Sequence, residues 1–221
     1  MLNRRAVVRF GGICGLLYVV LAIPSFVVGH PALIDNEMNP QEVLDYFNAG
    51  QAGFVVWNGL LFIFAAFFFL WFLGILHGML RHAEGAEETG LTSIALAGGL
   101  TLIALKLVGV SAEIHYSSTL ARFDNFLEDA QLAFLSVELS GWLYRYAYNV
   151  GAAVLISATS VVALNTGVLQ RWLTWAGLVV ALVMLLHFII PLGSLLALLW
   201  VVMVSVLMLS GTARRPRPAT G

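Results

Sequence analysis

Long apolar runs separated by short polar segments form the pattern of this chain. A membrane-spanning helix needs about 20 mostly apolar residues. The runs therefore predict helices over about residues 8–28, 53–80, 91–113, 132–164, 172–190 and 193–210. The last two come from one apolar block that exceeds a single span and that Pro191 and Gly193 interrupt. We predict an all-α, polytopic membrane helix bundle with six transmembrane helices, and the alternative is five spans with a kinked or re-entrant final segment.

The same pattern predicts a single transmembrane domain over residues 1–211, followed by a basic cytoplasmic tail over 212–221. Between the first two spans, Asn39 suits a helix N-cap and Pro40 the first helical position, while Gly50 suits a stop. The apolar residues of this segment share one face at helical spacing; they are Val43, Leu44 and Phe47. A second such segment, LARFDNFLEDAQ, precedes the fourth span. We predict short amphipathic helices in the outer loops, acting as packing lids or as gates.

Composition supports the membrane class, because 60% of the 221 residues are hydrophobic, only 10% are charged, and the mean hydropathy is +0.92. Ordinary soluble domains carry about 25% charged residues. The net charge of -1 gives no indication of a nucleic-acid partner. The apolar composition predicts the lipid bilayer as the partner of the chain. The single cysteine, Cys14, excludes an intramolecular disulfide and a cysteine-rich zinc site.

Basic residues predict the orientation of the chain in the membrane. Eight arginines lie on the side of both termini, namely Arg4, Arg5, Arg9, Arg81, Arg171, Arg214, Arg215 and Arg217. The loops of the other side contain only Arg122. Because cytoplasmic loops carry the excess of Lys and Arg, we predict a multi-pass protein of the plasma (inner) membrane with both termini cytoplasmic.

Lys106, the only lysine of the chain, lies deep within the third predicted span. An ionisable side chain at that depth costs about 2.5–3.5 kcal/mol on insertion scales, so it normally faces a protein interior or a watery cavity. Glu113 follows two helical turns later, and Gly99 precedes by the same interval, so the three form one stripe. The stripe predicts a polar, inward-facing side of this helix.

A matching stripe on the fourth predicted span contains Glu138, Gly141, Arg145, Asn149 and Ala152. In antiparallel helices these charges share the depth of Lys106 and Glu113, which predicts that Lys106 pairs with Glu138 and Glu113 with Arg145. Asn58 and His187 fall in the same half of the membrane. The candidate polar cavity therefore contains Lys106, Glu113, Glu138, Arg145, Asn149, Asn58 and His187.

Two interpretations of these polar residues stay open. Compensated charges can simply fix the register of the helices, with long basic side chains reaching the interface beside an aromatic belt of Trp142, Tyr144, Tyr146 and Tyr148. Alternatively, the charges line a cavity that binds a small polar or amphipathic ligand, or that moves protons or ions. Lys106 is deeper than an interfacial anchor requires, which favours the cavity.

Motifs that carry catalysis are not found in the sequence. The five histidines form no HExxH or HxxxH pair, no GxSxG motif occurs, and the glycine pairs lie within predicted helices rather than in a phosphate-binding loop. Glu113, His115, Glu138 and His187 could meet only through folding. We therefore predict no catalytic residue, no cofactor and no metal site.

Three local stretches resemble a known family: FLWFLGILHGMLRHAEG, LTSIALAGG and TGVLQRWLTWAGLV. Together they resemble a widespread bacterial family of small integral-membrane proteins of uncharacterised function. The resemblance implies a polytopic membrane fold and carries no activity or site residue to this chain. From the residues we predict a binding or transport protein with a polar cavity open toward the outer leaflet. The alternatives are a non-catalytic structural subunit that contacts other membrane subunits, and a membrane enzyme acting on lipid.

Overall fold

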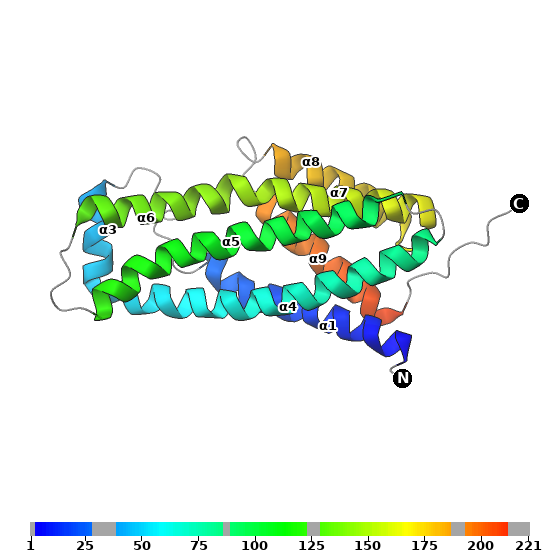
Figure 1. The fold of residues 1–221 in the computed structure, drawn as a ribbon, viewed down its shortest axis with the longest axis horizontal. Helices are drawn as coiled ribbons and strands as arrows, with labels where there is room; N and C mark the ends of the chain where they lie inside the picture. Colours follow the sequence, from blue (N-terminus) through cyan, green and yellow to red (C-terminus); the bar gives the residue numbers. More distant parts are fainter. Residues whose placement is uncertain (1–2, 28–38, 86–88, 123–128, 187–192, 212–221) are drawn as a thin grey trace, which may run out of the picture.

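The computed structural model describes residues 3–27, 39–85, 89–122, 129–186 and 193–211, and within these ranges the chain is helical without any β-strand. The long helices run along one axis, and the short helix α3 lies across it at one end (Figure 1). Their bounds are α1 Arg4–Val27, α3 Pro40–Tyr46, η1 Phe47–Gln51, α4 Ala52–Glu84, α5 Leu91–Arg122, α6 Ala130–Trp142, η2 Leu143–Ala147, α7 Tyr148–Thr166, α8 Arg171–Leu185 and α9 Gly193–Ser210. The two η segments are π-helical turns.

Five of the described helical stretches are long and apolar enough to cross a membrane: Arg4–Pro24, Gly53–Glu84, Leu91–Thr119, Tyr148–Thr166 and Gly193–Ser210. The predicted helical membrane bundle is therefore confirmed in its coarse form. The predicted fifth span corresponds to α8, which has 15 residues and is shorter than a typical span. The predicted turn at Pro191 and the basic tail lie outside the described residues.

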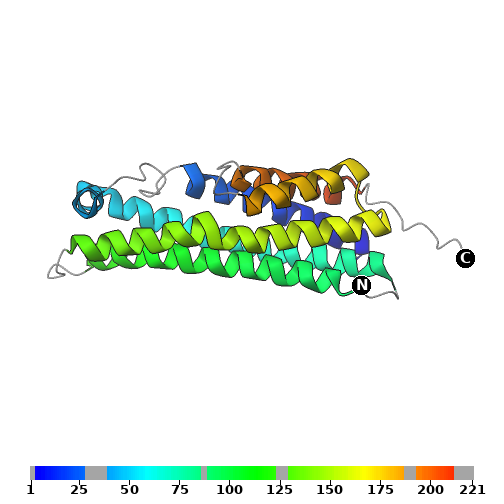
Figure 2. The ribbon, with the colours of Figure 1, turned by 90° about the horizontal axis from the view of Figure 1, so that it is seen from above.

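α4 and α5 are longer than α1, α8 and α9, so the two ends of the bundle contain different helices. α4 has 33 residues and α5 has 32, which corresponds to about 48–50 Å each at 1.5 Å per residue. α6, η2 and α7 form one continuous helical run beside them. α1, α8 and α9 cover only part of that length in both views (Figures 1 and 2). Among the described residues, one end of the bundle is therefore built from α3, η1, α4, α5 and α6.

Glycines bring α5 and α7 into close antiparallel contact. A Cβ added at Gly151 would lie 2.6 Å from the backbone nitrogen of Leu102, and one added at Gly98 would lie 2.6 Å from that of Leu155. Only a residue without a side chain permits backbones to approach so closely. This contact sets the register in which the polar residues of α5 and α7 meet.

The short helix α3 starts as the sequence predicts. Asn39 is its N-cap and accepts hydrogen bonds from the backbone of Gln41 and Glu42, while the Glu42 carboxylate accepts from Asn39 N at 2.8 Å. The predicted stop at Gly50 is wrong, because η1 continues the helical path into α4. α5 runs to Arg122, beyond its predicted end. Half of the second predicted loop helix, residues 123–128, lies outside the described residues, and the rest belongs to the end of α5 and the start of α6.

Candidate functional site

Lys106 lies in the interior of the bundle, with only 1% of its surface exposed. Its Nζ is 4.5 Å from the centroid of the Tyr148 ring on α7 and 5.5 Å from that of the Phe62 ring on α4. A cation at these distances from an aromatic face is attracted by the electrons of the ring. The aromatic rings therefore stabilise the amine away from bulk water.

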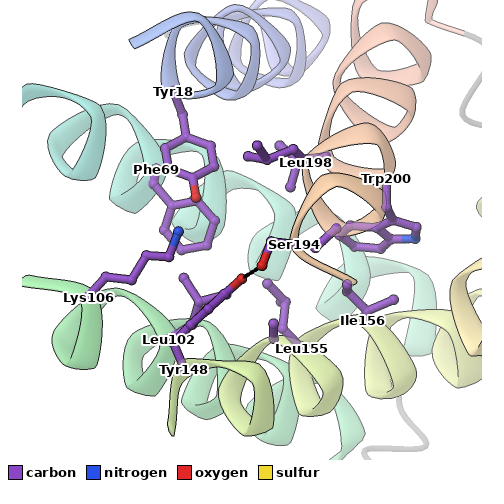
Figure 3. A pocket seen from close by; sticks show the side chains of 13 residues that line it. Tyr18, Phe69, Leu102, Lys106, Tyr148, Leu155, Ile156, Ser194, Leu198 and Trp200 are labelled. Carbon is purple, nitrogen blue, oxygen red and sulfur yellow. Dashed lines mark hydrogen bonds between the residues drawn. The ribbon is translucent and has the colours of Figure 1, made fainter. Parts of the chain in front are cut away.

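A small cavity adjoins the Lys106 amine and is lined from α1, α4, α5, α7 and α9 (Figure 3). Its polar side chains are Lys106, Tyr18, Tyr148 and Ser194. The Tyr148 and Ser194 hydroxyls share a hydrogen bond, and the Tyr18 hydroxyl and the Lys106 amine point toward one another in the view of Figure 3. The volume open to the centre of a water-sized molecule is about 20 Å³.

This volume limits what the cavity holds. A space of about 10–15 Å³ by this measure admits one water molecule, which then needs 2–4 polar partners. Lys106, Tyr18, Tyr148 and Ser194 are the lining residues that carry such groups. In this conformation the cavity therefore has room for about one water molecule and is too small for an amphipathic ligand.

Glu113 occupies a different part of the bundle, two helical turns or about 10.5 Å along α5 from Lys106. Its side chain is 5% exposed and accepts a hydrogen bond from Ser140 Oγ on α6 at 3.3 Å. Burial raises the pKa of Tyr46, at the end of α3, and the Glu113 carboxylate raises it further. Glu113 thus belongs to the end of the bundle that α3 covers.

The predicted ion pair between Lys106 and Glu138 is not formed, because Glu138 lies on the exposed side of α6 while Lys106 is buried. The physical reason is the π-helical turn η2, which adds one residue relative to a regular α-helix. On α7 the predicted inward-facing stripe is confirmed, because Asn149 and Ala152 are both buried. On α6, Gly141 of the predicted stripe is buried together with Ser140, whereas the preceding buried position is Val137 and not Glu138.

The other predicted site residues have separate positions. Asn58 is 9% exposed on α4, and Asn149 is 3% exposed on α7. Asn149 also borders an apolar surface groove with Trp142 and Tyr146, whose rings pack at 4.6 Å. Arg145 is part of η2, but its side chain is not among the described ones. His187 lies outside the described residues. The predicted pairing of Glu113 with Arg145 therefore stays a prediction.

Sequence reasoning missed the aromatic and hydroxyl members of the Lys106 cavity. Tyr148 was expected in an interfacial belt, yet it is 2% exposed and faces Lys106. Tyr18 is 3% exposed on α1, and Ser194 is on the first turn of α9. A signal was available for Tyr18 and Ser194, since each is a hydrogen-bonding side chain within an otherwise apolar run.

Comparison with known proteins identifies no relative, since no protein-family model, no curated protein and no solved structure matches the chain. The resemblance to a bacterial membrane family stays a prediction. Among the described residues, no group of three or more His, Cys, Asp or Glu side chains is placed to hold a metal ion.

Proposed function

We propose that this chain is a multi-pass membrane protein that binds or transports, and that Lys106 is the group that exchanges a proton or holds a water-sized polar molecule. The observation that carries the proposal is the burial of the only lysine beside a cavity whose lining also includes Tyr18, Tyr148 and Ser194. Burial of an ionisable group within a membrane helix costs stability, and such groups commonly mark ion or proton pathways.

The proposed substrate class follows from the size and polarity of the cavity. A volume of about 20 Å³ accommodates one water molecule, and a proton can be carried on that water or on the lysine. The proposed substrate class is therefore water or protons, and it leaves out the amphipathic ligands that the sequence allowed. A lysine amine can donate or accept a proton in transfer reactions. The tyrosine hydroxyls can donate to or accept from a water molecule beside it.

Proton flux into liposomes tests this proposal. Purified protein is reconstituted with a pH-sensitive dye inside, and a potassium gradient with valinomycin drives proton entry. We expect wild-type protein to accelerate acidification above empty liposomes, and Lys106→Met to return the rate to that of empty liposomes. Leu102→Met is the matched control, because Leu102 lines the same cavity without a titratable group. Equal flux in wild type and Lys106→Met would overturn the proposal.

We propose six spans, with α8 as the fifth, and both termini on the cytoplasmic side. The excess of arginine on the side of the termini supports this orientation. Cys14 is fully buried and is the only cysteine, so a cysteine-free background requires one substitution. In that background, Arg217→Cys should react with an impermeant thiol reagent only in inverted membrane vesicles. Reaction in right-side-out vesicles contradicts the orientation.

A structural subunit of a membrane assembly is the second candidate function, and one observation favours it. Gly74 and Gly78 are exposed on α4, four residues apart, and a Cβ added at either would meet nothing within 4 Å. Small residues at this spacing commonly mediate contact between membrane helices. Native mass spectrometry of wild type and Gly74→Leu distinguishes the candidates: loss of an oligomer in the variant supports the subunit, and a monomer in both excludes self-assembly through this face.

A further inference from the structure

Ser160 Oγ on α7 and Trp200 Nε1 on α9 are among the buried polar atoms that have no hydrogen-bond partner in the described part of the chain. The two side chains are 1% and 3% exposed, so bulk water does not satisfy them. Buried hydroxyl and indole N–H groups are nearly always hydrogen-bonded in folded proteins, and an exception indicates an ordered water or ligand.

The two atoms converge on one residue of a third helix, Gly177 of α8. A Cβ added at Gly177 would contact Ser160 Oγ and would lie 2.9 Å from Trp200 Nε1. Both atoms therefore approach α8 where it has no side chain. A donor from α9 and a hydroxyl from α7 thus meet at the surface of α8 within an apolar core.

We propose that Ser160, Gly177 and Trp200 form a binding site for one ordered water molecule between α7, α8 and α9. The indole N–H donates to the water oxygen, and the water donates to Ser160 Oγ. Water is the appropriate ligand class, because the groups present are one neutral donor and one hydroxyl, with no charge to attract an ion. Two polar partners are the minimum that a buried water requires.

This site is separate from the Lys106 cavity, although Trp200 takes part in both. The Trp200 ring lines the cavity, and Figure 3 shows its nitrogen directed away from Lys106. Trp200 follows Ser194 by six residues, which places it about 9 Å farther along α9 toward its C-terminal end. The indole ring therefore lines the Lys106 cavity with its carbon atoms and directs its nitrogen toward Gly177 of α8. The proposed water site does not depend on the function proposed above.

A double-mutant cycle in unfolding experiments tests whether the two atoms share a ligand. Ser160→Ala and Trp200→Phe should each lower the melting temperature in detergent, by about 2–4 °C for a chain of this size. The double variant should fall little below the lower single variant, because the first substitution already releases the water. Ser157→Ala is the matched control, since Ser157 Oγ bonds to the Val154 carbonyl on the same helix. A neutral or stabilising effect of either substitution would overturn the proposal, because replacing a buried polar atom that has no partner by an apolar one stabilises the fold. Additive losses in the double variant would also overturn it, because they would show that the two atoms share no ligand.

Nuclear magnetic resonance distinguishes a water from a direct bond between the two side chains. The Trp200 indole N–H of ¹⁵N-labelled protein in nanodiscs is assigned by its absence in Trp200→Phe. We expect a cross-relaxation signal between this N–H and a long-lived water, and its loss in Gly177→Ala, whose methyl group would displace Ser160 Oγ. The absence of a water signal in the wild-type protein overturns the proposal. Neither the unfolding experiment nor the resonance experiment measures transport. A negative result in either would therefore overturn the water site without bearing on the proposed proton flux.

Discussion

The amine of Lys106 lies 4.5 Å from the centroid of the Tyr148 ring, across the contact between α5 and α7. The same ring places its hydroxyl against Ser194 of α9. One tyrosine thus joins three helices and adjoins the buried amine of Lys106. The glycines that let α5 and α7 approach are the reason that this ring reaches the amine.

Substitution of Tyr148 should separate the role of its ring from that of its hydroxyl. Tyr148→Phe keeps the ring and loses the hydrogen bond to Ser194, a cost of about 0.5–1.5 kcal/mol. Tyr148→Leu also removes the aromatic face beside Lys106, which adds about 2 kcal/mol for a desolvated cation. Denaturant titrations in detergent should therefore rank wild type above Phe and Phe above Leu. Equal losses in both variants would show that the ring contributes nothing to Lys106.

Two glycines in different surroundings should respond oppositely to alanine. At Gly151 a methyl group would lie 2.6 Å from the backbone of Leu102, so Gly151→Ala should force α5 and α7 apart and cost about 1–3 kcal/mol. At Gly74 the added methyl meets nothing within 4 Å, so Gly74→Ala should be neutral or stabilise by up to about 1 kcal/mol. Thermal unfolding of both variants checks the contrast. A neutral Gly151→Ala contradicts the close contact of the helices.

The two carboxylates Glu113 and Glu138 should differ in their effect on stability. Glu113→Ala leaves buried Ser140 without its acceptor and should cost about 1–3 kcal/mol. Glu113→Gln retains an acceptor oxygen and should cost less. Glu138→Ala should remain within about 0.5 kcal/mol of wild type, because its side chain is exposed. A large loss at Glu138 in the unfolding free energy would restore its predicted pairing with a buried base.

Alkaline pH should weaken the contact of α3 with the bundle. Burial and the Glu113 carboxylate raise the pKa of Tyr46, so the folded protein holds the phenolic proton more tightly than the unfolded chain. This contribution is complete below about pH 10, the ordinary tyrosine pKa, and is lost as the pH rises through the higher folded value. The melting temperature of wild type should fall more steeply than that of Tyr46→Phe between pH 9 and 11. Parallel curves would refute the coupling.

Much of the fold follows from periodicity and length alone. The stripe of Gly99, Lys106 and Glu113 is buried as predicted, because α5 is a regular helix and residues two turns apart share a face. The N-cap of α3 could be predicted for a similar reason. Asn39 and Glu42 form a local capping box, and Pro40 suits the first helical position. Both features depend on residues close in sequence.

The candidate site was only partly predictable, because its composition depends on contacts between distant helices. Tyr18, Lys106 and Ser194 lie on α1, α5 and α9, and no local pattern relates them. The misplacement of Glu138 has another cause, since a π-helical turn changes the phase of a helix without a distinctive residue to mark it. A deep lysine thus indicated where to look, while its neighbours required the three-dimensional structure.

The π-helical turn η2 also has a consequence for how the length of this chain can vary. Because the turn holds one residue more than a regular α-helix, deletion of one residue within Leu143–Ala147 would leave α6 and α7 facing as they do now. The same deletion between Lys106 and Glu113 would rotate one of them by about 100° to the wrong side of α5. Homologous chains that differ by a single-residue gap should therefore place it at η2, and not in α5.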